Sequence, residues 1–337
     1  ATEVAGTILV GAAQPFFQCS PPLLSATWFG SSERALATAT AINFNQVGIA
    51  TAFLVGGLMA NTPAGMHRYF DVVAVAASVV AVATLLLFKE RPQTPPSASA
   101  AAAWAAEDAV LEANDTPSFQ LTYPGKAREL LKGQGFLFAL AAFVASIGCT
   151  NVVSAFTAPE LARAGFPEGF STDLAGAGFQ VAIVVGGIGL GRYVDQTKQF
   201  KKVMLTCLST AIFLLVGLGI SEGYEQSFAP AAVVALLLAL GAAVGPVQPI
   251  AAELAVEVAY PCDENAVEAT QQLAGNLFSA LLVPLCQVAS SYDLQFGGRQ
   301  ADMRGDTLVL IALVGLTAVY FTNFNAPLER TMLDEGS

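Results

Sequence analysis

Long apolar runs with few or no charges occupy most of this chain and constrain its fold more than any other feature. A run of about 20 such residues forms a helix that crosses the roughly 30 Å hydrocarbon core of a bilayer. Candidate spans lie near 4–27, 36–59, 70–88, 133–157, 173–191, 203–220, 228–250, 266–289 and 307–325. Charged residues make up 12% of the sequence, against about 25% in soluble domains. The sequence therefore predicts an all-α, polytopic membrane protein.

The polar segment 89–132 is the long interruption in this pattern. It begins with prolines and a Ser/Ala run, continues with acidic residues and ends in a basic stretch, 123–132, of possible helical character. Such a composition buries too little apolar surface to order itself, so we expect most of it to be flexible. The sequence then divides into helices within 1–88, a cytoplasmic linker at 89–132, six helices within 133–325 and a cytoplasmic tail at 326–337.

The distribution of basic residues supports this topology. If the linker is cytoplasmic and the spans alternate, eleven of the 15 Lys and Arg residues lie on the cytoplasmic side. The other four are Arg68, Arg163, Arg299 and Arg304. An excess of this sign is what the positive-inside rule requires.

Several classes of function are excluded or disfavoured. The net charge of −11 leaves no basic face for nucleic acid. The five cysteines are scattered singly, without metal-ligand spacing, so we expect free thiols and neither a metal nor a cofactor. No H-E-x-x-H motif, Walker loop or nucleophile elbow is present. We therefore expect no enzyme.

A weak internal repeat relates the first and last spans. A shift of about 230 residues places Gly11-Ala12-Ala13 on Gly241-Ala242-Ala243, Gln18 on Gln248 and Gln46 on Asn276. Parallel repeats of this kind build two-halved transporters, in which case three spans of the first half would precede Ala1. Chance similarity in an Ala-rich protein is the alternative.

The loop after the fifth span carries a recognisable pattern. Gly191, Asp195 four residues later, and the basic pair Lys201 and Lys202 resemble the loop signature of the major facilitator superfamily in its second-half copy. The resemblance implies a conformational latch in which Asp195 faces the N-terminus of a neighbouring helix and basic partners. The alternative is an ordinary positive-inside loop.

Two longer stretches narrow the family. The first, from Gln14-Pro15-Phe16-Phe17 to Val47-Gly48-Ile49-Ala50, resembles the fourth and fifth helices of the feline leukaemia virus subgroup C receptor family. The second, from Gly245-Pro246 to Leu277-Phe278, resembles its tenth and eleventh helices. The resemblance implies a twelve-helix, alternating-access transporter of which this chain keeps helices four to twelve. Members are associated with choline and ethanolamine transport, with a disputed role in haem export, and relatives with pyridoxine.

The resemblance also implies a binding site. In choline-transporting members, a glutamine on helix five and another on helix eleven face the substrate beside an aromatic cage. Gln46 matches the first, and Asn276, a shorter amide, stands in the place of the second. The cage tryptophan belongs to the first helix, which we expect to be absent here.

The residues themselves suggest further candidates. Asn151, Gln180, Gln248 and Gln272 are, like Gln46 and Asn276, amides in apolar helices, where an unpaired polar group is costly and should face a partner or a watery cavity. Hydrogen bonding between helices is the alternative. Phe143, with Phe156 and Phe179, offers an aromatic face for a quaternary ammonium, or else packs in the core.

The expected function follows from these observations. No acid, lysine or histidine lies near the middle of a predicted span, whereas proton-driven transporters place titratable groups in the membrane path. We predict facilitative uptake of a small organic solute, a choline-like cation first, by a monomer in the lipid bilayer of the plasma membrane. The alternatives are haem or a vitamin-like solute, and a non-transporting membrane receptor.

Overall fold

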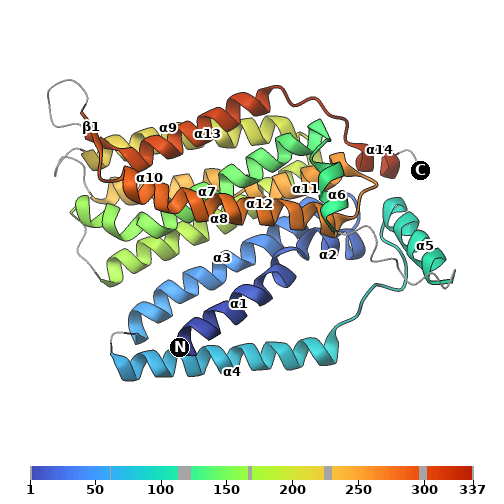
Figure 1. Cartoon of the computed structure of the whole chain (residues 1–337), viewed down its shortest axis with the longest axis horizontal. Helices are drawn as coiled ribbons and strands as arrows, with labels where there is room; N and C mark the ends of the chain where they lie inside the picture. Colours follow the sequence, from blue (N-terminus) through green and yellow to red (C-terminus); the bar gives the residue numbers. More distant parts are fainter. Residues whose placement is uncertain are drawn as a thin grey trace.

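The computed structural model describes residues 2–60, 62–112, 123–165, 169–223, 230–295 and 302–335, and these are almost entirely helical (Figure 1). The helices are α1 (Thr2–Gln18), α2 (Pro21–Trp28), α3 (Arg34–Met59), α4 (Pro63–Leu87), α5 (Ala98–Glu112), α6 (Tyr123–Leu130), α7 (Gln134–Arg163), α8 (Phe170–Thr197), α9 (Phe200–Gly223), α10 (Pro230–Val244), α11 (Val247–Ala259), α12 (Glu264–Ala289), α13 (Gly305–Thr322) and α14 (Glu329–Glu335). Strands β1 (Asp293–Gln295) and β2 (Asp302–Arg304) form a small antiparallel pair.

Eight helical segments are long and apolar enough to cross a membrane, with α10 and α11 counted as one. They coincide with eight of the nine predicted spans, so the predicted all-α membrane architecture is confirmed. Their outward faces are apolar, as lipid contact requires: Leu85, Phe213 and Leu281 are 75–85% exposed. The chain is an integral, multi-pass membrane protein.

Two predicted spans are broken at prolines. The first, 4–27, divides into α1 and α2, because Pro21 and Pro22 lack the N–H groups that would continue a helix and instead begin a new one. The span 228–250 ends as α10 at Val244 and resumes as α11 after Gly245 and Pro246. A hydropathy count does not detect such breaks, because proline interrupts hydrogen bonding without changing apolarity.

The prediction that most of 89–132 is flexible is wrong over α5. Alanine has the highest helix propensity, and the Ala run forms 15 residues of helix. The Arg34 guanidinium donates to the hydroxyls of Ser97 and Ser99, which holds the start of α5 against α3. The expected helical character of 123–132 corresponds to α6.

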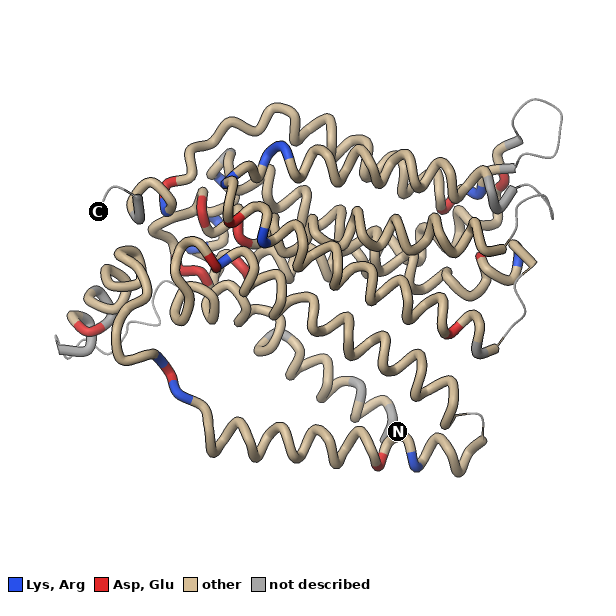
Figure 2. Tube along the Cα trace, turned by 180° about the vertical axis from the view of Figure 1, so that it is seen from behind, with Lys and Arg blue, Asp and Glu red and all other residues tan. Residues whose placement is uncertain are grey.

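Contacts between α3 and α8 are the most extensive of the bundle. Helix α7 packs on α11 and α12, α10 packs on α8 and α9, and α13 packs on α9. Helix α4 meets α3 at the turn that joins them and then diverges from the bundle, and none of its described side chains is buried (Figure 1). Charged residues gather at the two ends of the bundle, most of them near α5 and α14 (Figure 2).

Glycines allow the close helix contacts. A Cβ on Gly186 would overlap the carbonyl oxygen of Ala242 on α10, whereas a Cβ on Gly189, one turn along the same helix, would meet nothing within 4 Å. The two positions therefore form a matched pair for testing the packing of α8.

We predict that Gly186→Ala destabilises the protein by about 1–3 kcal/mol, because the methyl group overpacks the α8–α10 contact. Gly189→Ala should be neutral or stabilising by up to about 1 kcal/mol, since alanine favours helix. Thermal unfolding of the detergent-purified variants measures both. Equal unfolding midpoints for the two variants would contradict the described contact.

Candidate functional site

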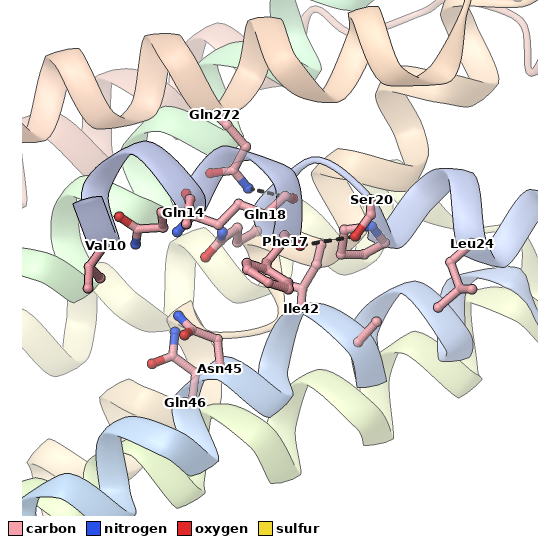
Figure 3. Close-up of a pocket in the computed structure, with 14 residues that line it drawn as sticks. Val10, Gln14, Phe17, Gln18, Ser20, Leu24, Ile42, Asn45, Gln46 and Gln272 are labelled. Atoms are coloured by element: carbon pink, nitrogen blue, oxygen red, sulfur yellow. Dashed lines mark hydrogen bonds between the residues drawn. The ribbon is translucent and has the colours of Figure 1, made fainter. Parts of the chain in front are cut away.

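A cavity of about 740 Å³ lies between α1, α2, α3, α11 and α12 (Figure 3). Its lining residues come from both ends of the sequence. They are Val10, Ala13, Gln14, Phe17, Gln18, Ser20, Pro21, Leu24, Ala41, Ile42, Asn45, Gln46, Gln248 and Gln272.

Amide side chains dominate the polar part of this lining. Figure 3 shows Gln272 reaching in from α12, the α1 side chains beside it, and Asn45 and Gln46 on the far side from α3. Each amide offers an acceptor oxygen and two donor hydrogens without formal charge. Phe17 adds an aromatic ring. None of these lining residues, all in the described part of the chain, carries a charge. The cavity suits a small polar solute.

The structure brings four of the predicted site residues to this cavity. Gln46, Gln248 and Gln272 line it directly. Asn276 reaches it indirectly, because its Nδ2 donates to Gln18 Oε1 over 3.5 Å. Gln18 of α1 thus lies between the predicted asparagine and the cavity.

The other three predicted residues lie outside this lining. Asn151 Nδ2 donates to Ser279 Oγ at 3.1 Å, and Gln180 Nε2 donates to Ser154 Oγ at 2.9 Å. Phe143 is fully buried in the core. These contacts are those expected of helix packing, and a role in solute binding stays a prediction for all three.

Sequence reasoning missed several lining residues on α1 and α3. Gln14 and Gln18 are four residues apart and therefore share one helix face, and Asn45 precedes Gln46. This spacing was a usable signal. Phe17 gave no signal, because an aromatic residue in an apolar run is indistinguishable from one that faces lipid.

A buried polar layer connects the helices that line the cavity to α14. Thr38 Oγ1 lies 2.8 Å from Ser25 Oγ and 3.1 Å from Glu253 Oε2. Arg330 of α14 lies 2.8 Å from Glu264 and 3.9 Å from Glu253. This layer joins α2 and α3 to α11, α12 and α14.

Asp195 joins α8 to the start of α3. Its Oδ1 accepts from the Ala35 N–H at 2.8 Å and its Oδ2 from the Leu36 N–H at 2.6 Å. A carboxylate at a helix N-terminus is stabilised by the helix dipole. The expected position of Asp195 at a neighbouring helix N-terminus is therefore present, while its action as a latch stays a prediction.

The other predicted latch residues have different surroundings. Gly191 permits the close approach of α3, since a Cβ there would lie 2.9 Å from Ala39 Cβ. Lys201 Nζ donates to the Phe324 carbonyl oxygen at 2.7 Å, and Lys202 is exposed. Lys198, which the prediction did not include, donates to the Ser31 carbonyl oxygen at 2.7 Å beside the α3–α8 contact.

Comparison with known families identifies the fold. The profile described as Major Facilitator Superfamily matches residues 2–287. The chain belongs to the major facilitator superfamily.

Curated relatives of this facilitator support the resemblance seen in the sequence. Solute carrier family 49 member A3 of Xenopus tropicalis is 29% identical over 98% of the chain and 67% of its own length. Choline/ethanolamine transporter flvcr2b of Danio rerio is 25% identical over 84% of the chain and 57% of its length. Choline/ethanolamine transporter FLVCR1 of Felis catus is 28% identical over 82% of the chain and 48% of its own length. The predicted likeness to the subgroup C receptor family is confirmed, and the chain spans about half to two thirds of these relatives.

The Asp195 contact makes a local prediction. Asp195→Ala removes the acceptors of the Ala35 and Leu36 amides, and hydrogen bonds to charged groups contribute about 1.5–3 kcal/mol each. We expect hydrogen–deuterium exchange of these two amides to rise at least about tenfold, the change that 1.4 kcal/mol produces. Asp71→Ala, at an exposed position on α4, is the control. Unchanged exchange in Asp195→Ala would contradict the contact.

Proposed function

We propose that this facilitator transports a choline-like organic cation by alternating access. The observation that carries the proposal is the amide-lined cavity, which includes Phe17 in a lining drawn from α1, α2, α3, α11 and α12. The names of two relatives, both choline/ethanolamine transporters, support the choice of solute.

The lining chemistry fits such a solute. A quaternary ammonium group is attracted to the face of an aromatic ring. A hydroxyl group of the solute exchanges hydrogen bonds with amides such as Gln46 and Gln248. Haem would instead require an axial ligand such as His, Cys, Met or Tyr for its iron. It would also require cationic side chains for its propionates. The fourteen lining residues of the cavity supply neither.

We further propose how the parts move. Helices α1–α4 form one unit and α7–α13 the other, with 89–132 between them on the cytoplasmic side. The α3–α8 contact, with Asp195 at its end, and the polar layer around Glu253 hold the cytoplasmic side closed in this conformation. Rigid-body rocking of the two units, a common form of such switching, would open it. We also propose a plasma-membrane monomer without enzymatic activity.

Facilitative transport remains part of the proposal. Its basis was the lack of an ionisable group near the middle of any span. Glu268 lies in the second turn of α12, near the end of the span, and so does not contradict this observation. It is nevertheless completely buried, one turn from the cavity residue Gln272. The lack of ionisable groups near the span centres therefore does not bear on a proton bound beside the cavity.

The proposal predicts uptake of labelled choline by proteoliposomes that contain the purified protein, and inhibition by unlabelled ethanolamine. Gln46→Ala should lower the initial rate by up to about tenfold, because one lost hydrogen bond is worth about 0.5–1.5 kcal/mol. Gln287→Ala, at an exposed position farther along α12 and outside the lining, is the matched control.

Two outcomes would overturn the proposal. Choline uptake no faster than in protein-free vesicles would exclude the solute class. Equal rates in Gln46→Ala and Gln287→Ala would exclude the cavity as its site and favour helix packing as the role of Gln46.

A further inference from the structure

Glu268 of α12 is a buried acid that the proposed transport site does not use. Its side chain has no exposed surface. One carboxyl oxygen, Oε1, accepts a hydrogen bond from Gln272 Nε2 at 2.8 Å. The other, Oε2, is buried and has no hydrogen-bond partner within the described part of the chain.

This geometry is unfavourable for an ionised carboxylate. A buried charge needs an ion-pair or several hydrogen bonds to offset the loss of water, and here a single neutral donor serves one oxygen. A proton on Oε2 removes the charge and leaves Oε1 free to accept from Gln272. The neutral acid is the form that this pocket accommodates.

The charges around Glu268 point the same way. Glu253 of α11 is also an acid, and a negative charge there disfavours the ionised form of Glu268. Arg330 of α14 is 2.8 Å from Glu264 and Lys126 of α6 is 2.7 Å from Asp263, so both cations already have acids as partners. Among the residues that the structure describes, none forms a salt bridge with Glu268.

The remaining neighbours include two cations, Arg128 and Arg163, and neither forms a salt bridge with Glu268 among the described residues. Cys19, in the turn between α1 and α2, is a thiol that interacts with Glu268. Helix α2 has no ionisable side chain. The other titratable groups that α7, α11 and α13 contribute along α12 are Cys149, Glu160, Arg163, Glu257, Asp306 and Tyr320, and α6 adds Tyr123, Arg128 and Glu129.

We propose that Glu268 is a proton-binding site, occupied in this conformation, and that a cationic solute in the cavity competes with its proton. The competition between solute and proton rests on the proposed function. Gln272 provides the link, because it lines the cavity and also donates to Glu268. A positive charge in the cavity favours the carboxylate, since charges interact strongly where water is excluded.

The proton balance is simple. When the solute cation enters, the O–H bond of Glu268 breaks, both electrons remain on Oε2, and the proton passes to water. The net charge of the site is zero in both states, because a neutral acid is replaced by a carboxylate together with the solute cation. Departure of the solute reverses these steps.

An ordinary structural role is the alternative. Glu268 and Gln272 are four residues apart, and polar pairs at this spacing stabilise helices by a few tenths of a kcal/mol. A purely structural pair requires no proton on Glu268 and no response to solute.

Infrared difference spectroscopy of the wild-type protein tests the proton site without any transport. We expect a C=O band of a protonated carboxylic acid near neutral pH that Glu268→Gln removes. Asp263→Asn, which deletes an acid at the exposed N-cap of the same helix and keeps a good capping residue, should retain the band. Absence of the band from the wild-type protein would overturn the proposal whether or not the variant folds, and so would its persistence in folded Glu268→Gln.

Choline binding at several pH values tests the competition. We expect choline to bleach the Glu268 band and its apparent affinity to fall several-fold as the pH is lowered, with no such fall in Glu268→Gln. The same pH dependence in wild type and variant would overturn the competition. If the band is present but choline does not bind at any pH, the proton site is supported and the proposed solute is excluded, so the two failures are distinguishable.

Discussion

The close contact between α3 and α8 is the interaction on which the rest of the structure depends. Gly187 and Gly191 have no side chains, and Asn43, Ala35 and Ala39 of α3 occupy the space that side chains there would fill. At the end of this contact, Asp195 accepts hydrogen bonds from the first turn of α3. Without this approach α3 would stand away from the bundle, and Asn45 and Gln46 would not face α11 and α12 across a cavity.

The bilayer imposes a second constraint, which sorts the polar groups. In hydrocarbon every polar group needs a partner inside the protein. Some hydroxyl groups meet this requirement within their own helix by donating to the carbonyl oxygen four residues earlier, as Thr51, Ser78 and Thr84 do. Among the described residues, the Lys, Arg, Asp and Glu side chains gather at the ends of the bundle (Figure 2), and Glu253, Glu264 and Arg330 lie in the buried polar layer. The cavity amides are the group for which a solute or water is a natural partner.

The sequence was sufficient for the span pattern, because a stretch such as α9 is recognised by length and apolarity alone. It was insufficient for the breaks at Pro21 and Pro246 and for the helix at 98–112, which depend on backbone hydrogen bonding and on the contact with Arg34. Among the amides, Gln46 and Gln180 give the same signal in the sequence. They differ in the direction in which each side chain points, and that direction depends on how the helices pack. Glu268 was overlooked because distance from the span centre was used in place of burial.

The interruption between α10 and α11 has a mechanical consequence. Pro246 has no N–H to donate, so the two helices meet at a joint instead of continuing as one rod. Helix α11 carries Gln248 at the cavity and Glu253 in the buried polar layer. Under the proposed alternating access, a tilt of α11 about this joint would move both residues together while α10 keeps its contacts with α8 and α9. A solute bound at Gln248 would then act on the buried polar layer through a single short helix.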